Sequence, residues 1–105
     1  MDASECKFFI GQVVLHRLFN YRGVIFDVDP VFSGSEDWYQ QMARSRPPKD
    51  QPWYHVLVSG AEHATYVAER NLEVDPSGMP VEHPALEQLF GEFRSGQYNT
   101  RVNNN

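Results

Sequence analysis

The sequence predicts a single, mainly β domain, in which about five short strands curl into a small SH3-like barrel or roll. A short helix is expected in the long loop and a second helix near the C-terminus. The chain has 105 residues, the size of one domain, and four segments rich in β-branched and aromatic residues fall within its first 70. A flat sheet of such short strands cannot bury both faces, whereas a curled sheet shelters one face and most of its edges.

The first two strands are expected at residues 11–17 (GQVVLHR) and 23–29 (GVIFDVD). Residues 19–22 (FNYR) supply the turn between them, because asparagine tolerates turn conformations. Pro30 ends the second strand, since a proline has no N–H to donate to the ladder. Strict alternation along the second strand assigns three apolar side chains to one face, namely Val24, Phe26 and Val28.

A short helix is expected to begin at Glu36 and to end before Pro47 and Pro48. Ser33 and Ser35 are equally suitable N-caps for it. The apolar residues that follow recur at helical spacing and form one stripe: Trp38, Tyr39, Met42 and Ala43.

Two further strands are expected at residues 53–59 (WYHVLVS) and 63–68 (HATYVA), joined by a tight turn at Gly60 and Ala61. That turn fixes which residues face each other: Leu57 and Ala64, His55 and Tyr66, Trp53 and Ala68. Residues 69–74 (ERNLEV) then close the sheet, with Leu72 in the core. We therefore expect the barrel domain to span residues 7–75.

The remaining residues, 76–105, are expected to form a C-terminal extension. Its helix should span residues 84–95, because Pro84 suits a first helical turn and Gly96 suits a stop. The apolar stripe of this helix either packs back on the barrel or docks into a groove of a partner: Leu86, Leu89, Phe90 and Phe93. The polar residues from 97 to 105 are expected to be a flexible tail.

Composition and charge limit the classes of function. The chain carries nine Lys and Arg against 14 Asp and Glu, a formal net charge of −5, so it lacks a strong basic footprint for nucleic acid. Its single cysteine, Cys6, cannot form an internal disulfide. No apolar run approaches the length of a membrane span, and no signal peptide opens the chain. We therefore expect a cytoplasmic protein without membrane contact.

Four stretches of the chain carry a family resemblance: residues 11–16 (GQVVLH), 21–30 (YRGVIFDVDP), 50–58 (DQPWYHVLV) and 66–72 (YVAERNL). Together they resemble the YccV-like family, also called hemimethylated-DNA-binding domains, and within it the bacterial heat-shock proteins. The resemblance covers residues 8–84. The chain departs from the pattern at Leu15, where members usually carry a basic residue, and this removes one candidate phosphate contact.

The resemblance implies an SH3-like barrel without enzymatic activity. It implies a stress-related factor that binds the Lon protease and enhances or redirects the degradation of specific or denatured proteins, including the replication initiator DnaA. It also implies binding to hemimethylated DNA and self-association into a homo-oligomer.

The densest basic stretch is residues 44–49 (RSRPPK). Phosphate contacts from these side chains, with base stacking on neighbouring aromatic rings, would suit DNA. The stretch is equally readable as an exposed loop whose charges keep the chain in solution. With the residues that flank the first turn, the candidates for DNA contacts are Arg17, Arg22, Arg44, Arg46 and Lys49.

Aromatic residues are numerous, at 13% of the chain, and a core of this size has limited room for them. Some of them could therefore line a groove that binds an extended peptide or another partner. The alternative is that they pack in the core. The candidates for partner contacts are Trp38, Tyr39, Trp53, Tyr54 and Tyr66.

Asp27 and Asp29 alternate to the same face of their strand, where they could act as an acid/base pair or as ligands of a hard metal. They could also be the solvated side of an edge strand. The four histidines lie on four different segments, without the spacing of a metal site, and His55 has the neighbours of a packed strand histidine. We therefore expect no catalytic residue, no bound metal and no cofactor.

Overall fold

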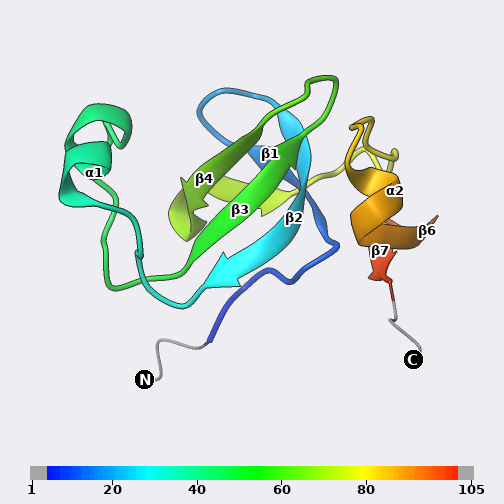
Figure 1. Cartoon of the computed structure of the whole chain (residues 1–105), viewed down its shortest axis with the longest axis horizontal. Helices are drawn as coiled ribbons and strands as arrows, with labels where there is room; N and C mark the ends of the chain where they lie inside the picture. Colours follow the sequence, from blue (N-terminus) through cyan, green and yellow to red (C-terminus); the bar gives the residue numbers. More distant parts are fainter. Residues whose placement is uncertain (1–4, 102–105) are drawn as a thin grey trace.

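The computed structural model describes residues 5–101 as a five-stranded antiparallel sheet with a smaller two-stranded sheet against it (Figure 1). The strand order in the large sheet is β4-β3-β2-β1-β5. Its strands are β1 (Val13–His16), β2 (Arg22–Asp29), β3 (Trp53–Val58), β4 (Ala64–Ala68) and β5 (Leu72–Val74). The predicted mainly β class is confirmed, and the open sheet, with β4 and β5 as its edges, is compatible with an SH3-like roll.

The predicted register of the β3–β4 hairpin is confirmed, since Leu57 lies opposite Ala64 and Trp53 opposite Ala68. The pairing of β2 with β3 contains a β-bulge at Phe26. An extra residue reverses the alternation that follows it. Val28 therefore packs on the same side as Ile25, and the prediction that it shares a face with Phe26 is wrong.

Helix α1 (Glu36–Met42) lies in the long connection between β2 and β3, as predicted. Of the two candidate N-caps, Ser35 caps the helix: its hydroxyl oxygen accepts a hydrogen bond of 3.1 Å from the backbone N–H of Trp38. Of the predicted apolar stripe, Trp38, Tyr39 and Ala43 pack on the sheet near the start of β3, whereas Met42 is exposed. This cluster contains Tyr39, Ala43, Trp53 and Ala68, with Phe32, Trp38 and Tyr66 partly buried against them.

The C-terminal helix is much shorter than predicted, because α2 spans only Leu86–Leu89. Strand β6 (Phe90–Arg94) follows at once and pairs with β7 (Gln97–Thr100). Both turn residues, Ser95 and Gly96, have positive φ angles, of 54° and 80°, as a two-residue hairpin turn requires. The predictions of a helix up to residue 95 and of a flexible tail over residues 97–100 are therefore wrong. Residues 102–105 of the predicted tail lie outside the described residues.

Two physical reasons explain this correction. Gly91 costs a helix about 1 kcal/mol relative to alanine but is tolerated in an exposed strand. Phe90 and Phe93 both stack on Tyr98, with ring centroids 5.8 and 4.8 Å apart, and this cross-strand contact competes with the helical stripe.

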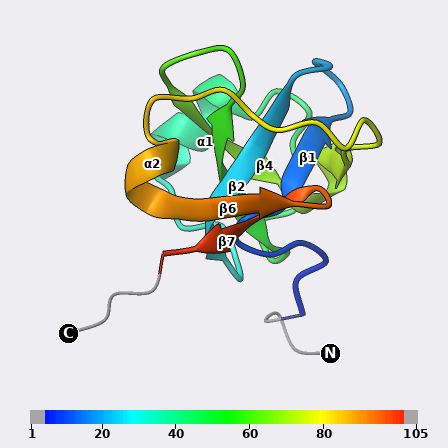
Figure 2. The same cartoon turned by 90° about the vertical axis from the view of Figure 1, so that its right-hand side faces the viewer.

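The C-terminal segment packs back on the large sheet (Figure 2). Its anchor is Tyr98, whose hydroxyl oxygen accepts a 2.8 Å hydrogen bond from the backbone N–H of Val81. The shared core contains Val13, Val24, Leu57, Val81, Phe90 and Tyr98. The hairpin and α1 thus occupy opposite ends of the molecule (Figure 1), and no helix of residues 5–101 has the length and apolar character needed to cross a membrane.

We predict that Gly23→Ala destabilises the fold by about 1–3 kcal/mol, because the sheet leaves no room for a methyl group there. A β-carbon at this position would lie 2.5 Å from the carbonyl oxygen of Leu57 and would also overlap Val56. The measurement is the midpoint of urea unfolding. Gly91→Ala is the matched control, since its nearest neighbour would be 3.7 Å away. Equal midpoints for the two variants would contradict the prediction.

Candidate functional site

An open groove of about 870 Å³ lies between the β1–β2 turn, the α1 connection and strand β4. Its lining is mostly apolar. The turn contributes His16, Leu18, Phe19 and Tyr21; the connection contributes Trp38, Met42, Ala43, Arg44, Ser45 and Pro47; the sheet contributes Trp53, Asn71 and all six residues from 63 to 68.

The rim of the groove exposes large apolar side chains. Phe19 is 71% exposed, Met42 63% and Leu18 57%. Phe19 and Leu18 stand on the β1–β2 turn, and Met42 stands on the last turn of α1. Apolar side chains gathered around a concave surface are typical of a binding site.

The β1–β2 turn is held in shape by His16, which is 4% exposed. Its Nδ1 accepts hydrogen bonds from the backbone N–H groups of Leu18 and Phe19, at 3.2 and 3.1 Å. The imidazole also stacks between Phe19 and Tyr21, at centroid distances of 4.7 and 5.0 Å. Burial lowers the pKa of His16, which favours the neutral ring that can accept these bonds.

The opposite wall of the groove is an aromatic cluster. Tyr66, Trp38 and Trp53 are in mutual contact: the Tyr66 ring lies 5.5 and 5.2 Å from the two indole rings, which are 6.0 Å apart. The Tyr66 hydroxyl donates a 2.6 Å hydrogen bond to Asp29. Burial, and then this bond, raise the pKa of Tyr66, so the phenol stays neutral and the wall is fixed.

Of the five aromatic residues proposed to meet a partner, Trp38, Trp53 and Tyr66 line the groove. Trp53 is only 1% exposed there, and the structure also buries Tyr39 and Tyr54. The Tyr39 hydroxyl donates to the carbonyl oxygen of Pro47 at 2.6 Å, and the Tyr54 hydroxyl donates to Glu69 at 2.5 Å. The sequence did not single out His16, Leu18 or Phe19 for the groove, although two apolar residues beside a hairpin turn are a signal of such a rim.

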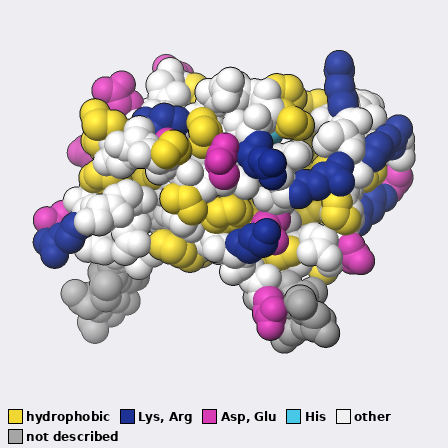
Figure 3. All heavy atoms as spheres, turned by 180° about the vertical axis from the view of Figure 1, so that it is seen from behind, with side chains coloured by type: hydrophobic (Ala, Val, Ile, Leu, Met, Phe, Trp, Pro, Cys, Tyr) yellow, Lys and Arg dark blue, Asp and Glu magenta, His cyan; other side chains and the backbone are white. Residues whose placement is uncertain are grey.

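The five basic candidates have different surroundings. Arg44 is exposed at the groove. Arg46 and Lys49 pack over the ring of Tyr39, 6.0 and 4.3 Å from its centroid, and Lys49 also pairs with Glu36. Arg17 donates to the carbonyl oxygen of Arg70 at 3.2 Å. Seen from behind (Figure 3), Lys and Arg side chains gather toward the end that carries α1, with acidic side chains among them.

Arg22 has a structural role in the fold. Its Nε donates a 3.0 Å hydrogen bond to the buried carboxylate of Asp75, and its other nitrogens donate to the carbonyl oxygens of Met79 and Pro80. Burial opposes ionisation of Asp75, but the bonds from Arg22 and Ser77 outweigh it and lower the pKa of this carboxyl group. This clamp fixes the loop after β5 to β2.

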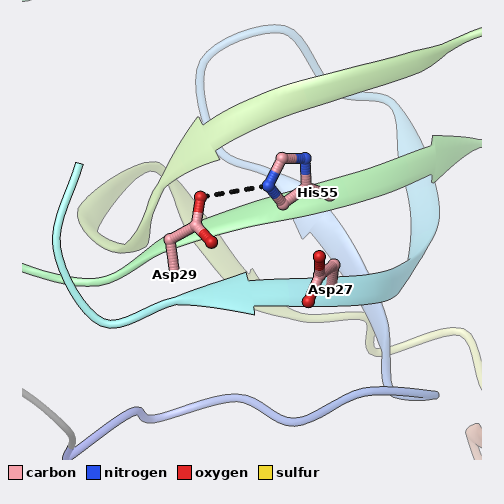
Figure 4. A group of neighbouring side chains, drawn as sticks. All are labelled: Asp27, Asp29 and His55. Atoms are coloured by element: carbon pink, nitrogen blue, oxygen red, sulfur yellow. Dashed lines mark hydrogen bonds and ion pairs between the residues drawn. The ribbon is translucent and has the colours of Figure 1, made fainter. Parts of the chain in front are cut away.

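Asp27, Asp29 and His55 come together at the β2–β3 boundary (Figure 4), where one ligand atom from each lies within 4.8 Å of the others. Asp29 is already the acceptor for three groups: Ser33 at 2.7 Å, Tyr66 at 2.6 Å and His55 at 3.1 Å. Burial opposes its ionisation, but these bonds outweigh it and lower its pKa. The cluster does not line the groove, and we interpret it as a structural latch.

The geometry of the groove suits binding. Its walls are aromatic and aliphatic, its one charged group other than histidine is Arg44, and its two histidines lie on different walls. The lining forms an apolar trough whose walls are held by hydrogen bonds before a ligand arrives.

We predict that the β1–β2 turn responds to pH through His16. A lowered pKa means that this interaction stabilises the fold fully above the ordinary value of 6.5 and is lost as the pH falls through the lowered value. In an NMR titration, the His16 ring should show a midpoint below 6.5, and the amide shifts of Leu18 and Phe19 should follow it. The amides of Ser95 and Gly96 are the control. A midpoint at or above 6.5 would contradict the prediction.

The comparison with known protein families agrees with the resemblance seen in the sequence. Residues 6–97 match the family described as "Hemimethylated DNA-binding protein YccV like". The matched range includes the whole five-stranded sheet, the groove and both helices. The chain therefore belongs to the YccV-like family.

Proposed function

We propose that this protein is a non-catalytic specificity factor for the Lon protease. It acts in the cytoplasm during stress and directs specific or denatured proteins, including DnaA, to degradation. The proposal follows the resemblance to the bacterial heat-shock members of the family, known as HspQ. In this role the protein binds the substrate proteins, and the protease cleaves them.

The groove is the observation that carries this proposal. A factor that directs unfolded chains needs an apolar surface that stays open in its own folded state. Phe19 and Met42 supply such a surface, with most of each side chain exposed. The hydrogen bonds to His16 and Asp29 hold the two walls in place, so little conformational entropy is lost when a partner binds.

We predict that the protein increases the rate at which purified Lon degrades a denatured model protein or DnaA. Met42→Ser should remove most of the increase, because it takes an apolar side chain that is 63% exposed from the rim. Met79→Ser is the matched control, since Met79 is 58% exposed but does not line the groove. An unchanged rate and unchanged substrate choice with the wild-type protein would refute the proposal.

A second candidate function is binding to hemimethylated DNA, and the description of the matched family favours it. The basic side chains near α1 offer a local surface for phosphates, and the half-buried Trp38 lines the same groove as Arg44. Two features weigh against strong binding. The chain carries a net charge of −5, and Arg22 is committed to Asp75.

If DNA is the ligand, we predict that Arg44→Ala combined with Arg46→Ala weakens binding and flattens its dependence on salt, by about one unit of slope for each phosphate that the variant no longer neutralises. Both side chains are exposed, so the fold should survive. Arg94→Ala, on the distant hairpin, is the control. Fluorescence anisotropy with unmethylated, hemimethylated and fully methylated duplexes measures the effect. Equal affinity for all three would exclude a methylation sensor.

A further inference from the structure

We propose that the groove binds an extended polypeptide segment that adds to the edge of β4 as a new strand. The segment is apolar at alternate positions and carries a carboxylate side chain. This inference rests on the proposed function and names the chemistry of the chain that the protein would capture.

The first argument is that β4 is an edge strand with its hydrogen-bonding groups turned toward the groove. The strand order leaves β4 with β3 on one side only. The N–H of Val58 donates to the carbonyl oxygen of His63 at 3.2 Å, so His63 points its backbone groups at β3. Because antiparallel pairs alternate, the N–H and C=O groups that point away from β3 belong to Ala64, Tyr66 and Ala68.

Other backbone groups do not occupy this edge within the described chain. Outside regular strand and helix pairing, the backbone hydrogen bonds of residues 5–101 include none to Ala64, Tyr66 or Ala68. Every residue from 63 to 68 borders the groove, but Val67 and Ala68 are only 4% and 2% exposed, so the accessible part of the edge lies at residues 64–66. A peptide lying there would be within reach of the open donors and acceptors, the arrangement used in strand addition.

The second argument is that β4 lacks the features that usually protect an edge. Natural edge strands carry charges, prolines or bulges that prevent pairing with other chains. Strand β4 (ATYVA) has neither a charged residue nor a proline, and its pairing with β3 has no register shift. The other edge, β5, is only three residues long and exposes Glu73. The large sheet is therefore open to a new strand at β4.

The third argument concerns charge. Arg44 lines the groove, and no Asp or Glu within residues 5–101 does. Arg44 takes part in none of the ion pairs found within residues 5–101. An apolar trough with one uncompensated cation favours a segment that brings a carboxylate.

These observations also disfavour a second copy of the chain as the occupant. A twofold pairing through β4 would bring the same cationic rim, with Arg44, toward itself. Strand β4 has no carboxylate to offer in return. An apolar trough beside a row of peptide groups is equally unsuited to the phosphates of DNA.

The test uses the full-length protein and short synthetic peptides of alternating Val and Ser with one central Asp. A second peptide carries Lys in place of Asp, and a third and a fourth are N-methylated at alternate amides, one on each edge of the strand. We expect the Asp peptide to bind, and the Lys peptide and one of the two N-methylated peptides to bind at least about tenfold more weakly. Arg44→Glu should reverse the preference between Asp and Lys, whereas Arg94→Glu should not change it.

Hydrogen exchange in the same samples locates the peptide. Binding should slow exchange at the amides of Ala64 and Tyr66. Equal binding of the Asp peptide and of both N-methylated peptides would overturn strand addition. If the Asp peptide does not bind, the whole inference is overturned. Slowing that depends on protein concentration without peptide would assign the edge to a second copy and would also overturn it.

The outcome is separable from that of the proposed function, because the binding assay contains no protease. Lon stimulation without peptide binding would refute only this inference. Peptide binding without Lon stimulation would refute the role with Lon and leave the peptide site standing.

Discussion

The carboxylate of Asp29 is the contact on which the shape of the binding face depends. It stands at the end of β2 and accepts hydrogen bonds from β3 through His55, from β4 through Tyr66, and from the connection to α1 through Ser33. One acid thus joins three strands to the segment that carries the wall of the groove. Its lowered pKa has the same origin, because each donor favours the ionised form and together they outweigh burial.

The two walls of the groove are fixed by different means, and both restrict motion before a ligand binds. On one side, neutral His16 accepts two amide hydrogen bonds and holds Phe19 outward. On the other side, Tyr66 packs against two tryptophans that also contact each other. Fully burying a large apolar side chain contributes about 1.5–3 kcal/mol, so the exposed rim of Phe19 and Met42 represents free energy that a partner can recover.

The sequence predicted the elements that depend on local signals. The β3–β4 register followed from its glycine turn, and α1 from a serine cap and an apolar stripe. The prediction of a helix over residues 90–95 was wrong because Phe90 and Phe93 fit a helical stripe as well as a hairpin. Only contact with Tyr98 decides between the two. Three of the five aromatic candidates reached the groove, but periodicity could not separate them from the buried Tyr39 and Tyr54. The pairing of Arg22 with Asp75 spans 53 residues and leaves no local pattern.

An unprotected edge strand is a hazard for most proteins, since edges of different molecules can pair and aggregate. Here the edge lies at the bottom of a trough. The β1–β2 turn rises on one side, with Leu18 and Phe19, and the α1 connection rises on the other, with Met42 and Arg44. In the proposed strand addition, a single extended chain fits between these walls, whereas the edge of a folded sheet also brings strands behind it and side chains on both faces. In this mode of binding the walls favour unfolded segments over folded ones.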